Sequence, residues 1–396
     1  MNAILRYRWT ILGLIFFCQL AQAISYQGIP PILGILVQSL HISYTQAGGL
    51  MSLYSLPRIL MALPSGVLVD RYGTKKVGRF SLLLLTIGTA MVAVGDSYGV
   101  LGAGRFLSGL GTTFLLVVTL HAITSWFWDR EMGLSMGIFH TAMPLGTILS
   151  LNFVGVSASH FGWRAPIFTI FVMSFSAFAL FIMLYREMNI DKNVSHEPLN
   201  LLKSLKKAGW GIWLVGSMWG FLNASVIPYF TYAPDYFVSQ GRSFSQAGLL
   251  ASYPMWASIV LAPLVGIFID RVGKKRLLIF IGFAASAILF YLMPRFPQHA
   301  AVFAISLGVF CAIQPTPIFS LPAELLPSSV RGVGFGIIAT SGAIGMVLGP
   351  YIAGGLRDFT GDYLWSFNAI AILSALGMLP ILLLKRRSSP EKQTVI

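Results

Sequence analysis

Charged side chains are scarce in this sequence. Lysine, arginine, aspartate and glutamate make up 10% of its 396 residues, whereas a soluble globular domain carries about 25%. Hydrophobic residues make up 56%, and the mean hydropathy is +0.77. This composition excludes a soluble globular protein and predicts an all-α integral membrane protein.

Cysteine and the residue clusters that support catalysis are also nearly missing. The two cysteines, Cys18 and Cys311, lie inside apolar runs, where neither a disulfide partner nor a metal is indicated. The sequence has no His/Asp/Glu cluster, nucleophile elbow or phosphate-binding loop, so we expect no enzyme, no cofactor and no metal. A non-transporting membrane sensor stays open as an alternative, although a sensor normally carries a soluble output domain and the longest loop here is too short for one.

Acidic residues are the rarest charged type, 13 against 27 lysines and arginines. None of them falls near the middle of an apolar run, whereas Arg58 and Arg105 both lie within one. A charge inside the membrane is costly and usually faces water or a counter-charge. Because no carboxylate is available at that depth, we predict that these guanidinium groups bind an anionic substrate. Two other interpretations remain: Arg105 is structural or gating, and Arg58 binds carbonyls freed near Pro57 and Pro64.

Twelve apolar runs are long enough to cross a hydrocarbon layer of about 30 Å. They span residues 9–38, 45–69, 77–95, 98–126, 133–157, 165–185, 209–237, 245–269, 277–294, 300–322, 331–356 and 363–384. The last six repeat the first six at an offset of 199 or 200 residues, which indicates duplication. We therefore predict 12 transmembrane helices in two pseudo-symmetric six-helix bundles, 1–185 and 209–385, with a cytoplasmic connector, 186–208, and a cytoplasmic tail, 386–396.

Lysine and arginine are distributed unevenly between the two sets of loops. Of the 27, 21 lie on the side that carries both termini and only four on the other. Basic residues concentrate in cytoplasmic loops, so we place both termini in the cytoplasm and the chain in a bacterial inner membrane. The same placement in short loops argues against nucleic acid as a partner, despite the net charge of +14.

One loop motif occurs twice. The segment GVLVDRYGTKK (66–76) recurs as GIFIDRVGKKR (266–276). With GRFLSGLG (104–111), WFWDREMGLSMG (126–137), FGWRAPIF (161–168) and PAELLPSSVRGVGFG (322–336), it makes the chain resemble the major facilitator superfamily over essentially its whole length. The Gly-Pro pair that antiporters of this family tend to carry in helix five is replaced by Met143-Pro144, so the drug-efflux subtype is not favoured.

The resemblance implies a secondary transporter whose two bundles rock around a central site. It assigns a conformational switch to loop residues Gly66, Asp70, Arg71, Gly73, Lys75, Gly266, Asp270, Arg271, Gly273, Lys275, Arg130, Glu324 and Arg331. We expect Asp70 to meet the start of the eleventh helix (329–332) and Asp270 the start of the fifth (131–133), which would hold the cytoplasmic side closed. A carboxylate is favoured at a helix N-terminus.

Further polar residues are weaker candidates for the substrate site. Gln19, Gln22 and Tyr26 follow helical spacing in the first span, as Trp219 and Asn223 do in the seventh, where helix-packing bonds are the alternative. Gln314 precedes Pro315 and Pro317, a pattern that predicts a broken tenth helix. Glycines 102, 104, 109, 111, 342, 345 and 349 indicate close helix packing. Candidates for proton coupling are His140, His121 and Asp235.

These observations predict a monomeric transporter in the lipid bilayer that works by alternating access. We predict a small organic or inorganic anion as substrate, moved by proton symport or anion exchange. Proton-coupled efflux of drugs or other amphipathic compounds is the alternative, although it would favour an acidic residue in the cavity.

Overall fold

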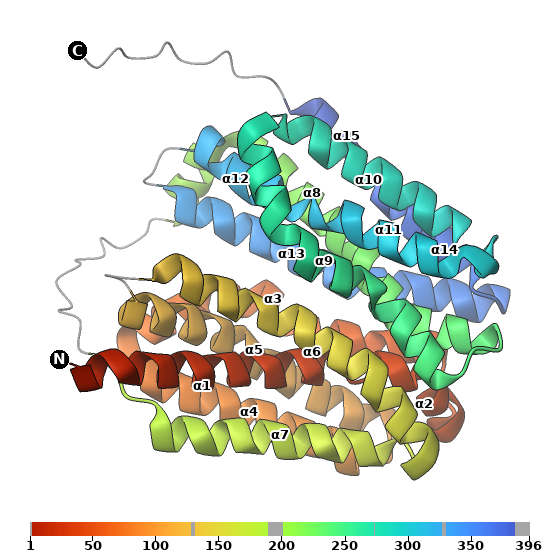
Figure 1. The fold of residues 1–396 in the computed structure, drawn as a ribbon, viewed down its shortest axis with the longest axis horizontal. Coiled ribbons are helices and arrows are strands. Elements are labelled where there is room, and N and C mark those ends of the chain that lie inside the picture. The colour runs from red at the N-terminus through yellow and green to blue at the C-terminus, as the bar shows by residue number, and fades with distance from the viewer. Residues whose placement is uncertain (1, 128–130, 189–200, 273, 327–329, 385–396) are drawn as a thin grey trace.

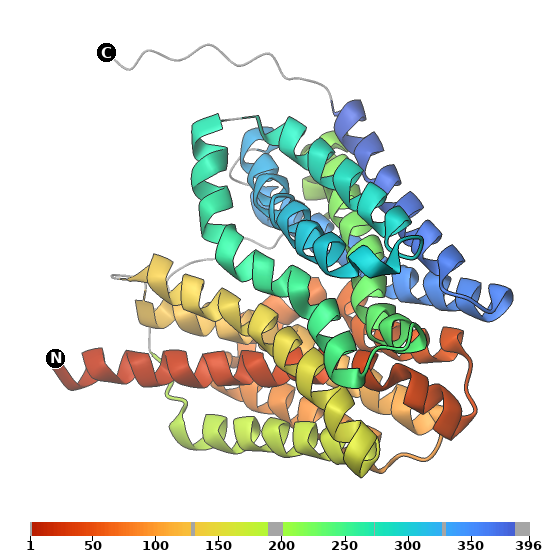
Figure 2. The ribbon, with the colours of Figure 1, turned by 45° about the vertical axis from the view of Figure 1, so that its right-hand side comes forward.

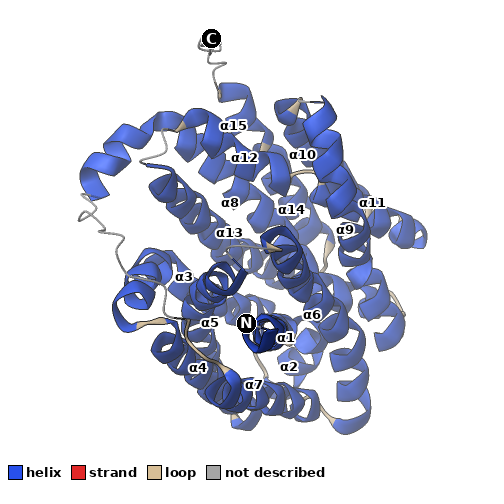
Figure 3. Cartoon of the chain, turned by 60° about the vertical axis from the view of Figure 1, so that its left-hand side comes forward, coloured by secondary structure: helices blue, strands red, loops and turns tan. Residues whose placement is uncertain are grey.

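The computed structural model describes residues 2–127, 131–188, 201–272, 274–326 and 330–384. Every described element is a helix (Figure 3). The first seven α-helices are α1 (Asn2–Gln27), α2 (Leu33–Leu40), α3 (Tyr44–Tyr72), α4 (Thr74–Val94), α5 (Tyr98–Phe127), α6 (Met132–Phe161) and α7 (Arg164–Leu184), with η1 (Pro30–Ile32) between α1 and α2. The second half holds α8 (Leu201–Ser239), α9 (Phe244–Val272), α10 (Lys275–Leu292), η2 (Pro297–His299), α11 (Ala300–Ala312), α12 (Pro315–Leu325), α13 (Arg331–Thr360), α14 (Leu364–Leu376) and α15 (Met378–Leu383).

The helices form two bundles, α1–α7 and α8–α15, which lie one above the other in Figure 1. Ten segments of the described chain are long and apolar enough to cross a membrane, or eleven when the two parts of α3, bent by 66°, count as one span. Helix α9 occupies the remaining position of the predicted twelve. The all-α, two-bundle membrane fold predicted from the sequence is therefore confirmed.

Three of the twelve spans consist of two helices in series, because the chain breaks inside the membrane. Pro30 and Pro31 separate α1 from α2, and Gly377 separates α14 from α15. The break predicted at Pro315 is present, since α11 ends at Ala312 and α12 begins at Pro315. Proline cannot donate the backbone bond that continues a helix, so carbonyls are freed at such breaks.

The two bundles touch mainly at one end. We call the end that carries Asn2 and Leu383 the termini side and the opposite end the far side. Helix α3 packs against α13, and α6 packs against α9. Figure 2 shows the two bundles close together at the far side and splayed apart toward the termini side.

Hydrogen bonds across this interface descend from the far side to the middle of α3. The amide of Tyr44 donates to Asp358 (2.8 Å), and the Ser52 hydroxyl donates to the Val347 carbonyl (2.5 Å). Farther along α3 toward the termini side, the Arg58 guanidinium contacts the sulfur of Met346 at 3.8 Å.

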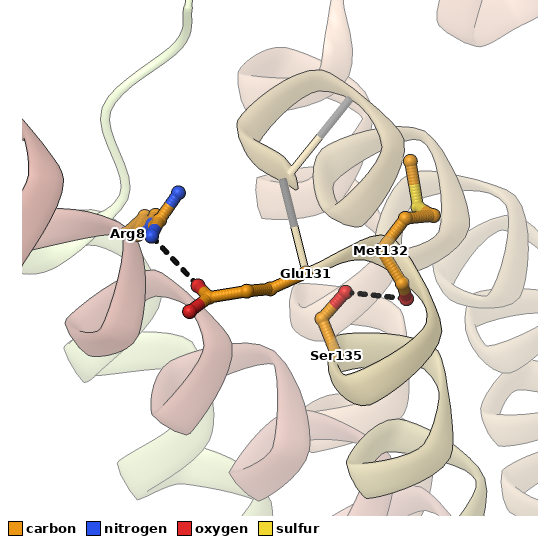
Figure 4. Close-up of polar contacts among 4 residues, drawn as sticks. All are labelled: Arg8, Glu131, Met132 and Ser135. Atoms are coloured by element: carbon orange, nitrogen blue, oxygen red, sulfur yellow. Dashed lines mark hydrogen bonds and ion pairs between the residues drawn. The ribbon is translucent and has the colours of Figure 1, made fainter. Parts of the chain in front are cut away.

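On the termini side, by contrast, the ion pairs that the structure describes stay within one bundle. Arg8 of α1 pairs with Glu131 at the start of α6 at 2.6 Å (Figure 4). Lys275 pairs with Glu324 at 2.6 Å, both in the second bundle. The described conformation is therefore closed at the far side, whereas the ion pairs described at the termini side do not join the two bundles.

Candidate functional site

The break in the first span provides hydrogen-bond acceptors for Arg105. In a continuous helix the carbonyls of Tyr26 and Gln27 would accept from the amides of residues 30 and 31, but both are prolines. The Tyr26 carbonyl instead accepts from Arg105 Nη2 (3.0 Å), and the Gln27 carbonyl accepts from Ser150 Oγ (2.6 Å). A buried carbonyl without a donor is costly in lipid, so these partners stabilise the break.

The remaining donors of Arg105 are also occupied. Nη1 donates to the Ser25 carbonyl (2.6 Å) and Nε to the Leu50 carbonyl of α3 (3.2 Å). The guanidinium lies 4.2 Å from the ring centroid of Tyr54, and the side chain is 2% exposed. Arg105 therefore ties α5 to α1 and α3 inside the first bundle and has little capacity left for a ligand.

Arg58 has a different environment. It lies on α3, half-buried, and its described polar contact is the weak one to Met346 of the other bundle. Within the described residues it has no carboxylate partner, since the ion pairs found there involve other residues. Its charge is thus available at the bundle interface, near the middle of the membrane.

Three polar side chains on one face of α1 are buried without a partner in the described chain. They are Gln19, Gln22 and Tyr26, which are 6%, 4% and 3% exposed, and the unpaired atoms are the two Oε1 oxygens and the Tyr26 hydroxyl. A buried polar atom left unpaired costs about 1–3 kcal/mol, so this row is a candidate for ligand contacts.

Sequence reasoning missed Tyr54 and Met346. The Tyr54 ring lies 5.2 Å from that of Tyr26, and its hydroxyl donates to the Gln22 carbonyl (3.4 Å). Met346 and Ile227 of the second bundle pack against the cluster that contains both tyrosines. Tyr54 could have been found, because it precedes Arg58 by four residues and so shares its helix face. Met346 required the tertiary contact between α3 and α13.

The three candidate residues of the second bundle make their described contacts within that bundle. Trp219 packs on Phe319, with ring centroids 4.8 Å apart, and lies against Gly342 of α13. Asn223 donates to the Trp219 carbonyl of its own helix (2.8 Å). Gln314 is fully buried, and its Nε2 donates to Ser286 Oγ of α10 (3.3 Å) and to Phe310 O of α11 (3.0 Å). Its Oε1 has no partner within the described residues.

The three protonatable candidates lie apart from one another. His140 on α6 is exposed and contacts the Phe139 ring. His121 Nδ1 contacts Thr74 Oγ1 at 2.9 Å and so joins α5 to the start of α4 on the termini side. Asp235 lies at the far side, where it accepts from the Tyr363 hydroxyl and abuts Gly34 of the first bundle.

The doubled loop motif is described in its first copy. Gly73 has φ of 84°, which side chains rarely tolerate, and a Cβ there would lie 2.6 Å from Glu187 Oε1, so a turn requires glycine. Glu187 also accepts from the Thr74 amide (2.8 Å). Asp70 and Arg71 are exposed, and Arg71 lies over the Tyr72 ring.

Several switch residues lie outside what the structure describes. Arg130 and Gly273 are not among the described residues, nor are the side chains at Gly266, Asp270, Arg271 and Arg331. The remaining ones are placed: a Cβ at Gly66 would meet no atom within 4 Å, and Lys75 is half-buried at the start of α4. The contact expected between Asp70 and residues 329–332 is therefore still a prediction.

The chain is similar to known transporters over most of its length. It is 24% identical over 375 residues to the Uncharacterized transporter YybO of Bacillus subtilis, covering 86% of this chain and 85% of that protein. It is 24% identical over 403 residues to the Probable sulfoacetate transporter SauU of Cupriavidus necator, covering 95% and 93%.

A solved structure shares the fold. The nucleoside transporter NupG, as its D323A mutant, superposes with a TM-score of 0.79 at 14% identity, covering 96% of this chain and all of that one. The Major Facilitator Superfamily model matches residues 15–245 and 237–395. With twelve spans in two bundles and matches of this extent, the chain is a multi-pass membrane transporter that belongs to the Major Facilitator Superfamily.

Proposed function

We propose that this transporter carries a small organic or inorganic anion and that Arg58 binds it. The first bundle (1–185) and the second (209–385), joined by the connector 186–208, rock around this site. The chain acts as a monomer in a bacterial inner membrane with both termini in the cytoplasm, so the described state faces inward. Coupling is by proton symport or by exchange of one anion for another.

The observation that carries this proposal is the difference between the two arginines. Arg105 is saturated by carbonyls, whereas Arg58 has only a sulfur contact within the described residues. Arg58 also shares a helix face with Tyr54, whose ring packs on Tyr26 of the unpaired polar row of α1. A guanidinium without a protein counter-charge supports a substrate that brings one, and its planar fork suits a carboxylate, sulfonate or other oxyanion. The printed name of the relative SauU, a probable sulfoacetate transporter, supports the same class.

Uptake into proteoliposomes tests the proposal. The purified protein is supplied with radiolabelled sulfonates, dicarboxylates and phosphate, and with a cationic dye, with and without a pH gradient. We expect uptake of at least one anion, and in Arg58→Gln a loss of apparent affinity of about 10- to 100-fold, which corresponds to one charge-assisted bond. Arg58→Lys should recover part of it.

Arg242→Gln provides the matched control, because Arg242 is exposed in a far-side loop. We expect that variant to transport like the parent. Dye transport without anion uptake would contradict an anionic substrate and indicate an amphipathic one. Unchanged affinity in Arg58→Gln would show that Arg58 does not bind the substrate.

A further inference from the structure

The helices α3 and α9 begin with the same capping sequence, 200 residues apart. In α3 the amide of Ser43 donates to Gln46 Oε1 (2.9 Å), and the amide of Gln46 donates to Ser43 Oγ (3.1 Å). Ser243 and Gln246 repeat both bonds in α9, at 3.3 Å each. This capping box satisfies the first and fourth amides of each motif and leaves the two between them without an intrahelical acceptor.

The two free amides of α3 are taken by a residue of the other bundle. Asp358 of α13 accepts from the Tyr44 amide (2.8 Å) with one oxygen. Its other oxygen accepts from the Thr45 amide (2.7 Å) and from the Thr45 hydroxyl (2.5 Å). Three donors from one helix end thus converge on a single carboxylate, where the helix dipole also favours negative charge.

The surrounding contacts hold Asp358 against α3. The Tyr44 ring packs edge-on against Tyr363, with ring centroids 6.0 Å apart, and the Arg357 guanidinium lies 4.8 Å from the Tyr44 centroid and 4.7 Å from that of Tyr363. A Cβ at Gly354 would lie 2.6 Å from the Tyr44 carbonyl, so the two backbones are in direct contact.

The duplicated interface lacks this arrangement. The corresponding amides of α9, those of Phe244 and Ser245, have no acceptor among the described residues. The positions 199 and 200 residues before Asp358 are Ser159 and Ala158, neither of which is charged, and the Ser159 hydroxyl bonds within its own helix. The interface between α6 and α9 is joined instead by a neutral bond from Asn152 to Ser252 (3.0 Å).

We propose that Asp358 is a latch between the bundles: its carboxylate caps the start of α3 and holds the transporter closed at the far side. Opening the far side separates α13 from α3 and breaks all three bonds, so the latch sets the ratio of the two conformations. Both halves of the chain contribute a helix start with the same capping box, whereas the acid that binds it occurs in the second half only.

Distance measurements between spin labels test the latch without any substrate, so the result is independent of the substrate class proposed above. Labels are placed at Phe161→Cys and Phe296→Cys, exposed far-side positions in the two bundles, with Cys18 and Cys311 replaced by alanine. In Asp358→Asn and Asp358→Ala we expect the ratio of far-side-open to far-side-closed molecules to rise about tenfold or more, as for loss of one charge-assisted bond.

Two matched controls separate the latch from general damage. Asp362→Asn removes a nearby acid that caps α14 within its own bundle through the Leu364 amide (2.9 Å), and it should leave the ratio unchanged. Thr45→Pro removes two of the three donors in the first turn of α3, where the backbone amide has no intrahelical acceptor to lose, and it should open the far side, whereas Ser245→Pro at the equivalent place in α9 should not. Unchanged distances in both Asp358 variants, or equal changes in Asp362→Asn, would overturn the proposal.

Discussion

Two arginines that hydropathy alone cannot tell apart have separate roles in the structure. Both interrupt apolar runs, and a charge within the membrane costs free energy, so the sequence identifies both as candidates for a functional role. The prolines at 30 and 31 also show in advance that carbonyls are freed, but not which donor reaches them. Which donor reaches these carbonyls depends on the tertiary packing of α5 against α1. The sequence does not contain that contact, so it cannot separate Arg105 from Arg58.

This difference predicts a separation of stability from transport. Arg105→Leu leaves the carbonyls of Ser25, Tyr26 and Leu50 without their donor, and we expect the unfolding free energy to fall by about 3 kcal/mol or more, at about 1–3 kcal/mol per unpaired group. Thermal unfolding in detergent should show a clearly lower Tm. Arg58→Leu should keep the Tm of the parent while anion uptake falls, and a large Tm loss in Arg58→Leu instead would indicate a structural role there.

At the scale of the helices, glycines decide which pairs approach closely. A Cβ at Gly109 of α5 would lie 1.9 Å from the Tyr54 carbonyl of α3, and one at Gly345 of α13 would lie 2.0 Å from the Gly220 carbonyl of α8. The expectation of close packing at these two positions is confirmed. Which helix each glycine would face was not predictable, because the spacing of small residues marks a contact face without naming its partner.

Substitution at Gly109 tests the packing of α3 on α5. We expect Gly109→Ala to lower the unfolding free energy by about 1–3 kcal/mol, because the backbones must move apart. Gly99→Ala on the same helix is the control, since nothing lies within 4 Å of a Cβ there. Equal thermal stability of the two variants would show that α3 and α5 adapt to the methyl group. Tyr54 and Arg58 lie on α3, which Gly109→Ala would displace, so this variant should also weaken substrate affinity.

For the whole molecule, the duplication predicted the architecture but not the conformation. The offset of 200 residues anticipated two bundles. The structure adds that the repeat includes a capping box at the start of α3 and another at the start of α9. The far-side closure rests on Asp358, a residue that has no charged counterpart in the other half. A feature that breaks a repeat cannot be inferred from the repeat, so the closed side emerged only from the structure.

The orientation of the molecule follows from its basic loops and can be tested with reporters. We expect green fluorescent protein fused after Ile396 to fluoresce and alkaline phosphatase fused there to be inactive, because 21 of the 27 lysines and arginines lie on the termini side. Alkaline phosphatase fused after Gly241, in a far-side loop, should be active. The reverse pattern would turn the described state into an outward-facing one.

The broken first span also bears on how the protein is made. The carbonyl of Ser25 finds its donor 80 residues later in the chain, at Arg105, and that of Gln27 finds its donor 123 residues later, at Ser150. Lipid offers no substitute for these donors. The backbone of the first span therefore becomes fully hydrogen-bonded only after the fourth and fifth spans have been synthesised. The first five spans therefore reach their final packing together rather than one at a time.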